Sequence, residues 1–450
     1  MPKSATLRLP LAALTAAACL YIGTAAAADP APHFDQPLTL VQLTDLTLSN
    51  NPATRIAWAS IRSSEAGVEL ARSGYWPQVS VGYSFERLKQ VNTNGVAGGV
   101  QNRYGPAIDL SYLLWDFGVR SGTTDAAKYA LTASQLDANQ TMQDLILQVE
   151  QDYYQVLGFQ AVQDADLQSV QDATASLDAA NQRKGSGLAT IGDVYQAEAA
   201  LAGAKLALQT AQGQLAVARG QLALTVGYPA DSAIPLASWD DQVNATLPPG
   251  NIHDLLAKAE DARPEVLASK AQEQAAVATL EATKAQGWPV LTLDASAGRN
   301  TTDLGGKKTT STAYSAGLNL SFPLFTGFAD QADNRRAQAA VDIAQATTDQ
   351  LVQAVQLEVW QAYQNMRTAA SNLDTTSAGL KSAQQAGDVT QARYKNGLDS
   401  ILDVLSAQAT LANARVQDVQ ARLNWFAALA AMGHAMGGLD VPKDKLEQQP

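Results

Sequence analysis

The chain contains the stretch Lys184-Gly185-Ser186-Gly187-Leu188-Ala189-Thr190-Ile191-Gly192-Asp193-Val194 and, 210 residues further on, its counterpart Tyr394-Lys395-Asn396-Gly397-Leu398-Asp399-Ser400-Ile401-Leu402-Asp403-Val404. Each stretch has a glycine that can adopt the left-handed conformation in which helices end. Each then has a hydroxyl residue followed three positions later by an aspartate, a spacing typical of a helix N-cap. These residues are Gly187, Thr190 and Asp193 in the first stretch and Gly397, Ser400 and Asp403 in the second. Both stretches therefore predict a tight reversal between two antiparallel helices.

The segments around these reversals are long and free of proline. No proline occurs between Pro106 and Pro229 or between Pro323 and Pro442, although the chain has 17. Because proline breaks the interior of a helix, such tracts indicate unusually long helices. Apolar residues within them recur every three or four positions, as in a coiled-coil seam. A helix from about Val119 to Arg183 would be roughly 100 Å long at about 1.5 Å per residue.

Four segments ahead of these tracts alternate apolar and polar residues, which is the period of a strand with one apolar face. The first residues of this alternation are Val79, Ile108, Leu291 and Tyr314. Between the strands of each pair, the polar composition predicts loops over 89–103 and 300–311. Aromatic residues mark the ends of the strands, at Trp76, Trp115, Trp288 and Phe325.

The order of helix, two strands, long helix, turn and helix occurs twice, which indicates a tandem duplication. The first helix of the first copy is predicted over about 40–73, with an interruption at Asn51-Pro52 that Pro264 matches in the second copy. We divide the chain into a signal peptide (1–28), a first repeat (29–227), an equatorial connection (228–251), a second repeat (252–436) and a polar C-terminal tail (437–450).

The beginning of the chain has the pattern of a secretory signal. Lys3 and Arg8 precede an apolar run, and Ala26-Ala27-Ala28 supplies a small-residue cleavage site. The single cysteine, Cys19, lies within this segment, and its lipidation stays open because the leucine usual in lipoprotein signals is absent three residues before it. We expect an exported protein whose mature form has no cysteine.

Composition excludes several classes of function. Asp and Glu number 43 against 31 Lys and Arg, and this net charge of −12 argues against a nucleic-acid partner. Three histidines and one cysteine leave little for a metal site, and we expect no cofactor. The Gly305-Gly306-Lys307-Lys308-Thr309 run lacks the earlier glycine and the following helix of a phosphate-binding loop. The chain is therefore not expected to be an enzyme.

Four strands are too few to close a membrane barrel, for which about eight are the minimum. An open sheet edge in lipid would leave backbone groups unpaired. If the strands enter a membrane, several copies must therefore contribute to one barrel. The alternative for the strands is an amphipathic sheet that packs on its own protein. The alternative function is that of a soluble periplasmic coiled-coil adaptor or scaffold, although this chain has two hairpins and such adaptors typically have one.

The duplicated order, Asn51-Pro52, the Trp-Pro pair at each strand entrance and the run from Tyr394 to Leu398 followed by Asp403-Val404-Leu405 resemble the TolC family of outer-membrane efflux channels. The resemblance implies an α+β membrane protein in which three protomers form a twelve-stranded barrel continuous with a twelve-helix periplasmic tunnel. It further implies a location in the outer membrane of a Gram-negative-type cell, contact with outer-membrane lipid, a periplasmic adaptor and an inner-membrane transporter as partners, and a passive conduit for efflux or secretion.

The same resemblance assigns roles to the two turns. It places Gly187, Leu188, Thr190, Gly397, Leu398 and Ser400 at tips that contact the adaptor. It also places Asp403, its counterpart Asp193, and Tyr394 at a periplasmic gate, to which we add Asp399. The sequence departs from the family pattern at Asp399 and Ser406, where a basic residue and an acid are expected. Three copies of Asp399 and Asp403 would form an acidic ring with carboxyl pKa values raised by mutual repulsion. Alternatively, Asp403 serves as the capping partner of Ser400.

Overall fold

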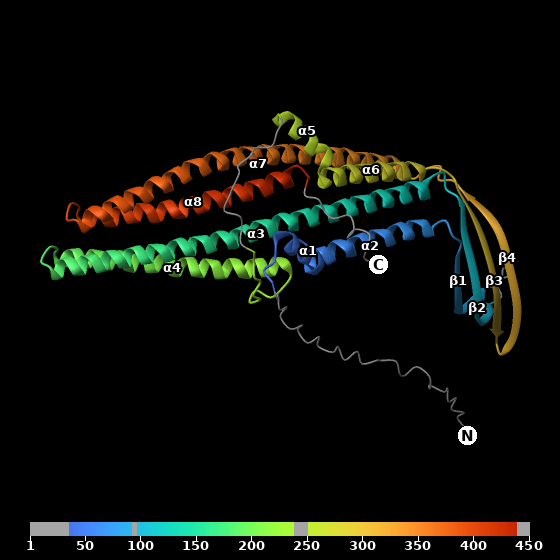
Figure 1. The fold of residues 1–450 in the computed structure, drawn as a ribbon. Helices are drawn as coiled ribbons and strands as arrows, with labels where there is room; N and C mark the ends of the chain where they lie inside the picture. Colours follow the sequence, from blue (N-terminus) through green and yellow to red (C-terminus); the bar gives the residue numbers. More distant parts are fainter. Residues whose placement is uncertain (1–35, 92–96, 238–250, 439–450) are drawn as a thin grey trace, which may run out of the picture.

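The computed structural model describes residues 36–91, 97–237 and 251–438. The predicted signal peptide with Cys19, most of the predicted equatorial connection and most of the predicted tail lie outside the described residues. Long helices lie side by side in two antiparallel pairs, with one sheet at one end and both helix reversals at the other (Figure 1).

Two short helices open each half of the chain. They are α1 (Leu40–Asn50) and α2 (Pro52–Ser73) in the first half, and α5 (Ile252–Ala262) and α6 (Pro264–Ala285) in the second. Asn51 ends α1 and caps α2, because its side-chain oxygen accepts a hydrogen bond from the Ala53 backbone N–H at 2.8 Å. Pro52 and Pro264 occupy first helical positions, where the missing N–H costs nothing. The predicted interruption at Asn51-Pro52 is confirmed.

The sheet has four antiparallel strands in the order β1 (Gln78–Val91), β2 (Ala97–Trp115), β3 (Val290–Leu304) and β4 (Lys307–Ser321). Its register pairs Val81 with Ile108 and Leu293 with Leu318. The strands are longer than predicted, so the loop bounds 89–103 and 300–311 are wrong. The polar ends still pair through their backbones, and Gly305 and Gly306, with φ of 59° and 92°, form a two-residue hairpin.

The long helices are α3 (Val119–Gly185) and α4 (Ile191–Val226) in the first half, and α7 (Ala329–Lys395) and α8 (Ile401–Ala435) in the second. α3 and α7 have 67 residues each, which corresponds to about 100 Å. α3 packs against α4, α7 packs against α8, and α3 also contacts α2, α6 and α8. The same succession of elements thus occurs in both halves. The sheet lies at one end of the long helices, and the turns lie at the other end.

The junction between sheet and helix in the first half is held by Arg120 and Asp116. The Arg120 guanidinium donates to the backbone carbonyls of Gly74, Leu113 and Leu114 at 3.2, 2.7 and 3.2 Å. Its Nε donates to buried Asp116 at 2.9 Å, and Asp116 also accepts from the Arg120 backbone N–H at the start of α3. One ion pair therefore fixes the direction in which α3 leaves the strands.

Candidate functional site at the helical tips

The first tip ends α3 and starts α4. Gly187 has a φ of +70°, and the Leu188 N–H donates to the Arg183 carbonyl at 2.8 Å across the turn. The Thr190 backbone N–H donates to the Asp193 carboxylate at 2.7 Å, and the Asp193 N–H donates back to the Thr190 hydroxyl at 3.2 Å. This reciprocal capping box confirms that the sequence pattern is a helix reversal.

The second tip repeats this geometry. Gly397 has a φ of +77°, and the Leu398 N–H donates to the Arg393 carbonyl at 2.9 Å. The Ser400 hydroxyl and backbone N–H both donate to Asp403, at 2.7 and 3.0 Å. These hydrogen bonds lower the pKa of the exposed Asp403 carboxyl. Asp403 is therefore a capping residue within a single chain, whatever the assembly adds.

The two tips are joined within one chain. The Arg183 guanidinium donates a hydrogen bond to the Tyr394 carbonyl and lies 4.7 Å from the centre of the Tyr394 ring. Buried residues from both hairpins form one apolar cluster beside this contact, namely Ala180, Val194, Ala197, Tyr394, Ile401 and Val404. Burial raises the pKa of Tyr394, Arg183 lowers it, and the charge of Asp193 raises it further. Tyr394 thus shares this cluster with Val194, the residue after Asp193, and its hydroxyl makes no hydrogen bond to another described residue.

Asp399 does not stand as a free carboxylate. The Nε of Arg393 donates to both of its oxygens at 2.9 Å, so each second tip carries an internal ion pair. Sequence reasoning missed this pair, although an arginine six residues before the acid, across a glycine turn, was a usable signal. Leu188 and Leu398 lie at the outermost point of the turns and are 69% and 68% exposed.

The aromatic residues at the strand ends fall into separate groups. Phe117 joins Trp115 and Trp288, with ring centroids 6.1 and 5.7 Å away. Phe325 contacts Phe328 at 5.5 Å, and Trp76 is exposed at the entrance of β1. Phe117 and Phe328 have positive φ values of 52° and 67° at the strand-to-helix corners. Their backbone conformation could not be read from residue type, because phenylalanine rarely adopts it.

A further ionic cluster, which the sequence did not reveal, lies midway along the helices. His434 of α8 contacts Asp144 of α3 through Nε2 at 2.7 Å and Glu358 of α7 through Nδ1 at 3.2 Å. Arg263, between α5 and α6, donates to Glu358 at 2.8 Å and to the His434 carbonyl at 3.1 Å, and it also pairs with Glu265. These contacts tie both halves of the chain together at one level.

The protonation of this cluster follows from its contacts. Both ring nitrogens of His434 face carboxylates, and only the doubly protonated imidazolium can donate from both. Although burial lowers the pKa of His434, the hydrogen bonds to Asp144 and Glu358 outweigh it and raise the pKa to about 9. The hydrogen bond from His434, with help from Arg263, lowers the pKa of Glu358 to about 2. His434 and Glu358 are therefore both charged at neutral pH.

The described residues contain no group of three or more His, Cys, Asp or Glu side chains arranged to hold a metal ion. Within the same residues, no helix combines the length and apolarity needed to cross a bilayer.

Comparison with known proteins places the chain. The model of the outer membrane efflux protein family matches residues 43–228 and 255–438. The chain is 32% identical to protein CyaE of Bordetella pertussis, over 90% of this chain and 85% of that protein. It is 26% identical to the outer membrane protein TolC of Salmonella enteritidis, over 90% and 83%.

Solved structures have the same fold. The outer-membrane channel OprN superposes with a TM-score of 0.79 at 23% identity, over 89% of this chain and 90% of that one. The CmeC outer membrane channel of Campylobacter jejuni also reaches 0.79, at 19% identity and over 91% and 88%. The family match favours an outer-membrane channel component over the soluble adaptor alternative. The chain belongs to the outer membrane efflux protein family, in which it is an outer-membrane channel component and not an enzyme.

Proposed function

We propose that three copies of this chain form one conduit through the outer membrane, with a twelve-stranded barrel and a tunnel of helices below it. The observation that carries this proposal is the sheet, whose order leaves β1 and β4 as edges without a partner strand among the described residues. Val81 on β1 and Tyr314 on β4 are 76% and 87% exposed. Pairing β4 with β1 of the next copy removes the edges and presents these residues to lipid.

The size of the assembly is tested by native mass spectrometry of the detergent-solubilised chain recovered from outer membranes. Three chains per particle give twelve strands, within the range of known membrane barrels. Recovery as a soluble periplasmic monomer would refute the conduit.

We also propose that the tips receive a periplasmic adaptor that couples the conduit to an inner-membrane transporter. Leu188 and Leu398 are exposed apolar side chains at the far end from the sheet, surrounded by the backbone turns at Gly187 and Gly397 and the caps at Thr190 and Ser400. A photo-crosslinking residue at position 398 should capture an adaptor of the membrane fusion protein class. The matched control is position 206 on α4, where Leu206 is equally exposed but remote from the tip. Equal capture at both positions would contradict tip docking.

The gate is the remaining part of the proposal. Three copies of Asp403, with Asp399, Asp193 and Tyr394 nearby, supply an acidic constriction at the tunnel mouth. Because Arg393 pairs with Asp399, Asp403 contributes most of the negative electrostatic potential at this constriction. In planar-bilayer conductance, Asp403→Asn should weaken block by divalent cations more than Asp399→Asn does. Asp342→Asn, an exposed change of the same charge far along α7, should leave block unchanged. Unchanged block in Asp403→Asn removes the acidic ring.

A further inference from the structure

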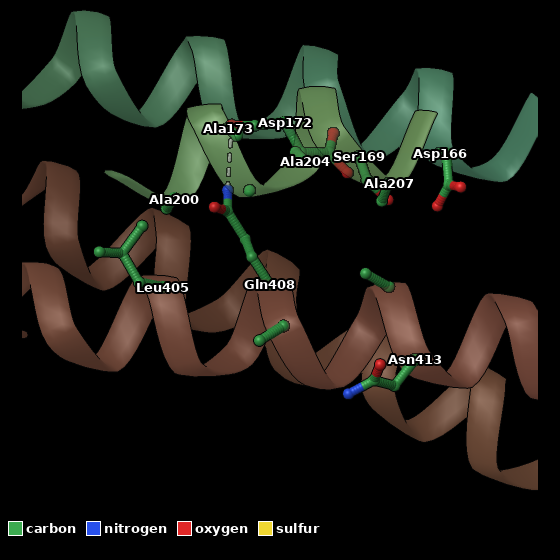
Figure 2. A pocket seen from close by; sticks show the side chains of 13 residues that line it. Asp166, Ser169, Asp172, Ala173, Ala200, Ala204, Ala207, Leu405, Gln408 and Asn413 are labelled. Atoms are coloured by element: carbon green, nitrogen blue, oxygen red, sulfur yellow. Dashed lines mark hydrogen bonds between the residues drawn. The ribbon is translucent and has the colours of Figure 1, made fainter. Parts of the chain in front are cut away.

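A cavity of about 290 Å³ lies between α3, α4 and α8 (Figure 2), and its lining residue Leu405 also packs against the apolar cluster at the tips. Six alanines and Gly203 form most of its wall. These small side chains cannot fill the space between three helices, and a Cβ placed on Gly203 would meet no atom within 4 Å. The cavity therefore has apolar walls contributed by both hairpins.

One charged group in this cavity lacks a partner. Asp166 of α3 is 8% exposed, and no described residue donates a hydrogen bond to it or pairs with it. Figure 2 shows its carboxylate pointing from α3 into the space between α3 and α8. Burial raises the pKa of this carboxyl. A carboxyl without an ion-pair partner in these mostly apolar surroundings favours a cation that can pair with it.

The polar groups at the other end of the cavity are already satisfied. Asp172 pairs with Arg415 at 2.9 Å, and the Gln408 amide donates to Ser176 at 2.7 Å and to the Asp172 carbonyl at 3.1 Å. Asp166 is thus the charged group that a ligand would meet, and the Asn413 amide is a second polar group in the lining. A single carboxylate provides far fewer oxygens than the six to eight that calcium takes, which argues against a bare metal ion.

We propose that this cavity binds a small organic ammonium ion, with its charged nitrogen on Asp166 and its apolar body against the alanines of α3, α4 and α8. The volume is near the lower end of that found for small-molecule sites, about 300 Å³. A charge-assisted hydrogen bond to the carboxylate gives the site its preference for cations. Because the bound molecule contacts α3 and α4 of one hairpin and α8 of the other, it bridges both hairpins of one chain.

The test is isothermal titration of the full chain, purified in detergent, with 1-adamantylamine and with its neutral counterpart 1-adamantanol. The amine should bind saturably, at one site per chain, and about tenfold more tightly than the alcohol, as one charge-assisted hydrogen bond implies. Asp166→Asn should lower the affinity for the amine to about that for the alcohol. Asp164→Asn, the same change at an exposed position two residues away, should keep the preference for the amine.

A second variant tests whether the ligands occupy the cavity, independently of the charge of Asp166. Gly203 is an exposed lining residue at which a Cβ meets no atom within 4 Å, so Gly203→Leu should fold, gain helix propensity, and weaken the binding of both ligands by narrowing the cavity at its rim. The proposal is overturned if wild-type chain shows no saturable binding of the amine, if Asp166→Asn keeps the preference, or if Gly203→Leu binds as the wild type does. Circular dichroism and particle mass check that each variant is folded. If Asp166→Asn does not fold, the binding measured with Gly203→Leu tests the proposal on its own.

Discussion

The ionic cluster of His434, Asp144, Glu358 and Arg263 predicts that the stability of the chain depends on the charge of His434. Replacing His434 by glutamine keeps a polar side chain of comparable reach but removes the cation that faces Asp144 and Glu358. The variant should unfold more easily than the wild type at neutral pH. Its deficit should disappear in alkaline solution, where the wild type loses the same charge.

The magnitude follows from the pKa of His434, which is raised from 6.5 to about 9. One pKa unit corresponds to about 1.4 kcal/mol, so the ionised cluster contributes about 3 kcal/mol per chain. The folded-state pKa lies above the unfolded one, so this contribution is fully present below about pH 6.5 and is lost as the pH rises through 9. The His434 side chain is 10% exposed, but its partners Asp144 and Glu358 are 52% and 42% exposed, so screening by solvent makes about 3 kcal/mol an upper value.

The assay is denaturant unfolding of the detergent-solubilised chain, followed by circular dichroism between pH 6 and pH 10. The measured quantity is the difference in free energy of unfolding between the wild type and His434→Gln. His253→Gln is the matched control, because His253 is exposed on α5. A difference of between about 1 and 3 kcal/mol at pH 6 that shrinks toward zero near pH 10 supports the cluster. A difference that does not change with pH, or one shared by His253→Gln, refutes the reasoning.

Three further changes test particular contacts. Gly397→Ala forces a Cβ onto a residue with φ of +77° and should lower the free energy of unfolding by about 1–2 kcal/mol, whereas Gly185→Ala, which meets no atom within 4 Å, should not. Gly105→Ala places a Cβ 1.8 Å from the Arg299 carbonyl oxygen and should reduce the yield of folded chain in outer membranes, while Gly82→Ala, in open space, should keep it. Arg183→Met removes the hydrogen bond and the cation–π contact to Tyr394, and it should speed backbone hydrogen exchange around residues 394–398 by about tenfold. Lys184→Met is the control and should leave this exchange rate unchanged. Equal exchange rates in the two variants would contradict a role for Arg183 in holding the tips together.

The features that were predictable from sequence are those in which the signal is local. Thr190 with Asp193 and Ser400 with Asp403 form capping boxes because residues three positions apart necessarily meet in a first helical turn. The long helices followed from the absence of proline, and the strands from alternation. Polar strand ends such as Lys307 to Thr312 escaped detection because backbone pairing needs no apolar face.

Contacts between distant parts of the chain could not be predicted in this way. Arg183 and Tyr394 are 211 positions apart, and His434 and Asp144 are 290 apart. Nothing in the local pattern selects these partners, since they meet only when α3, α7 and α8 pack at a particular rotation. The ion pair between Arg393 and Asp399 lies between these extremes, because it spans one turn whose glycine was recognised.

The two tips have the same backbone conformation, but the arginine of one tip contacts the other hairpin and the arginine of the other tip contacts its own turn. One sequence position explains this difference. Arg183 and Arg393 occupy equivalent places in the last turns of α3 and α7. In the second tip, Asp399 holds Arg393 within its own turn. The equivalent residue of the first tip is Ala189, which offers no acceptor, so Arg183 reaches across to Tyr394 of the other hairpin. The duplicated turn therefore became a joint between hairpins because one repeat lacks an acid that the other has.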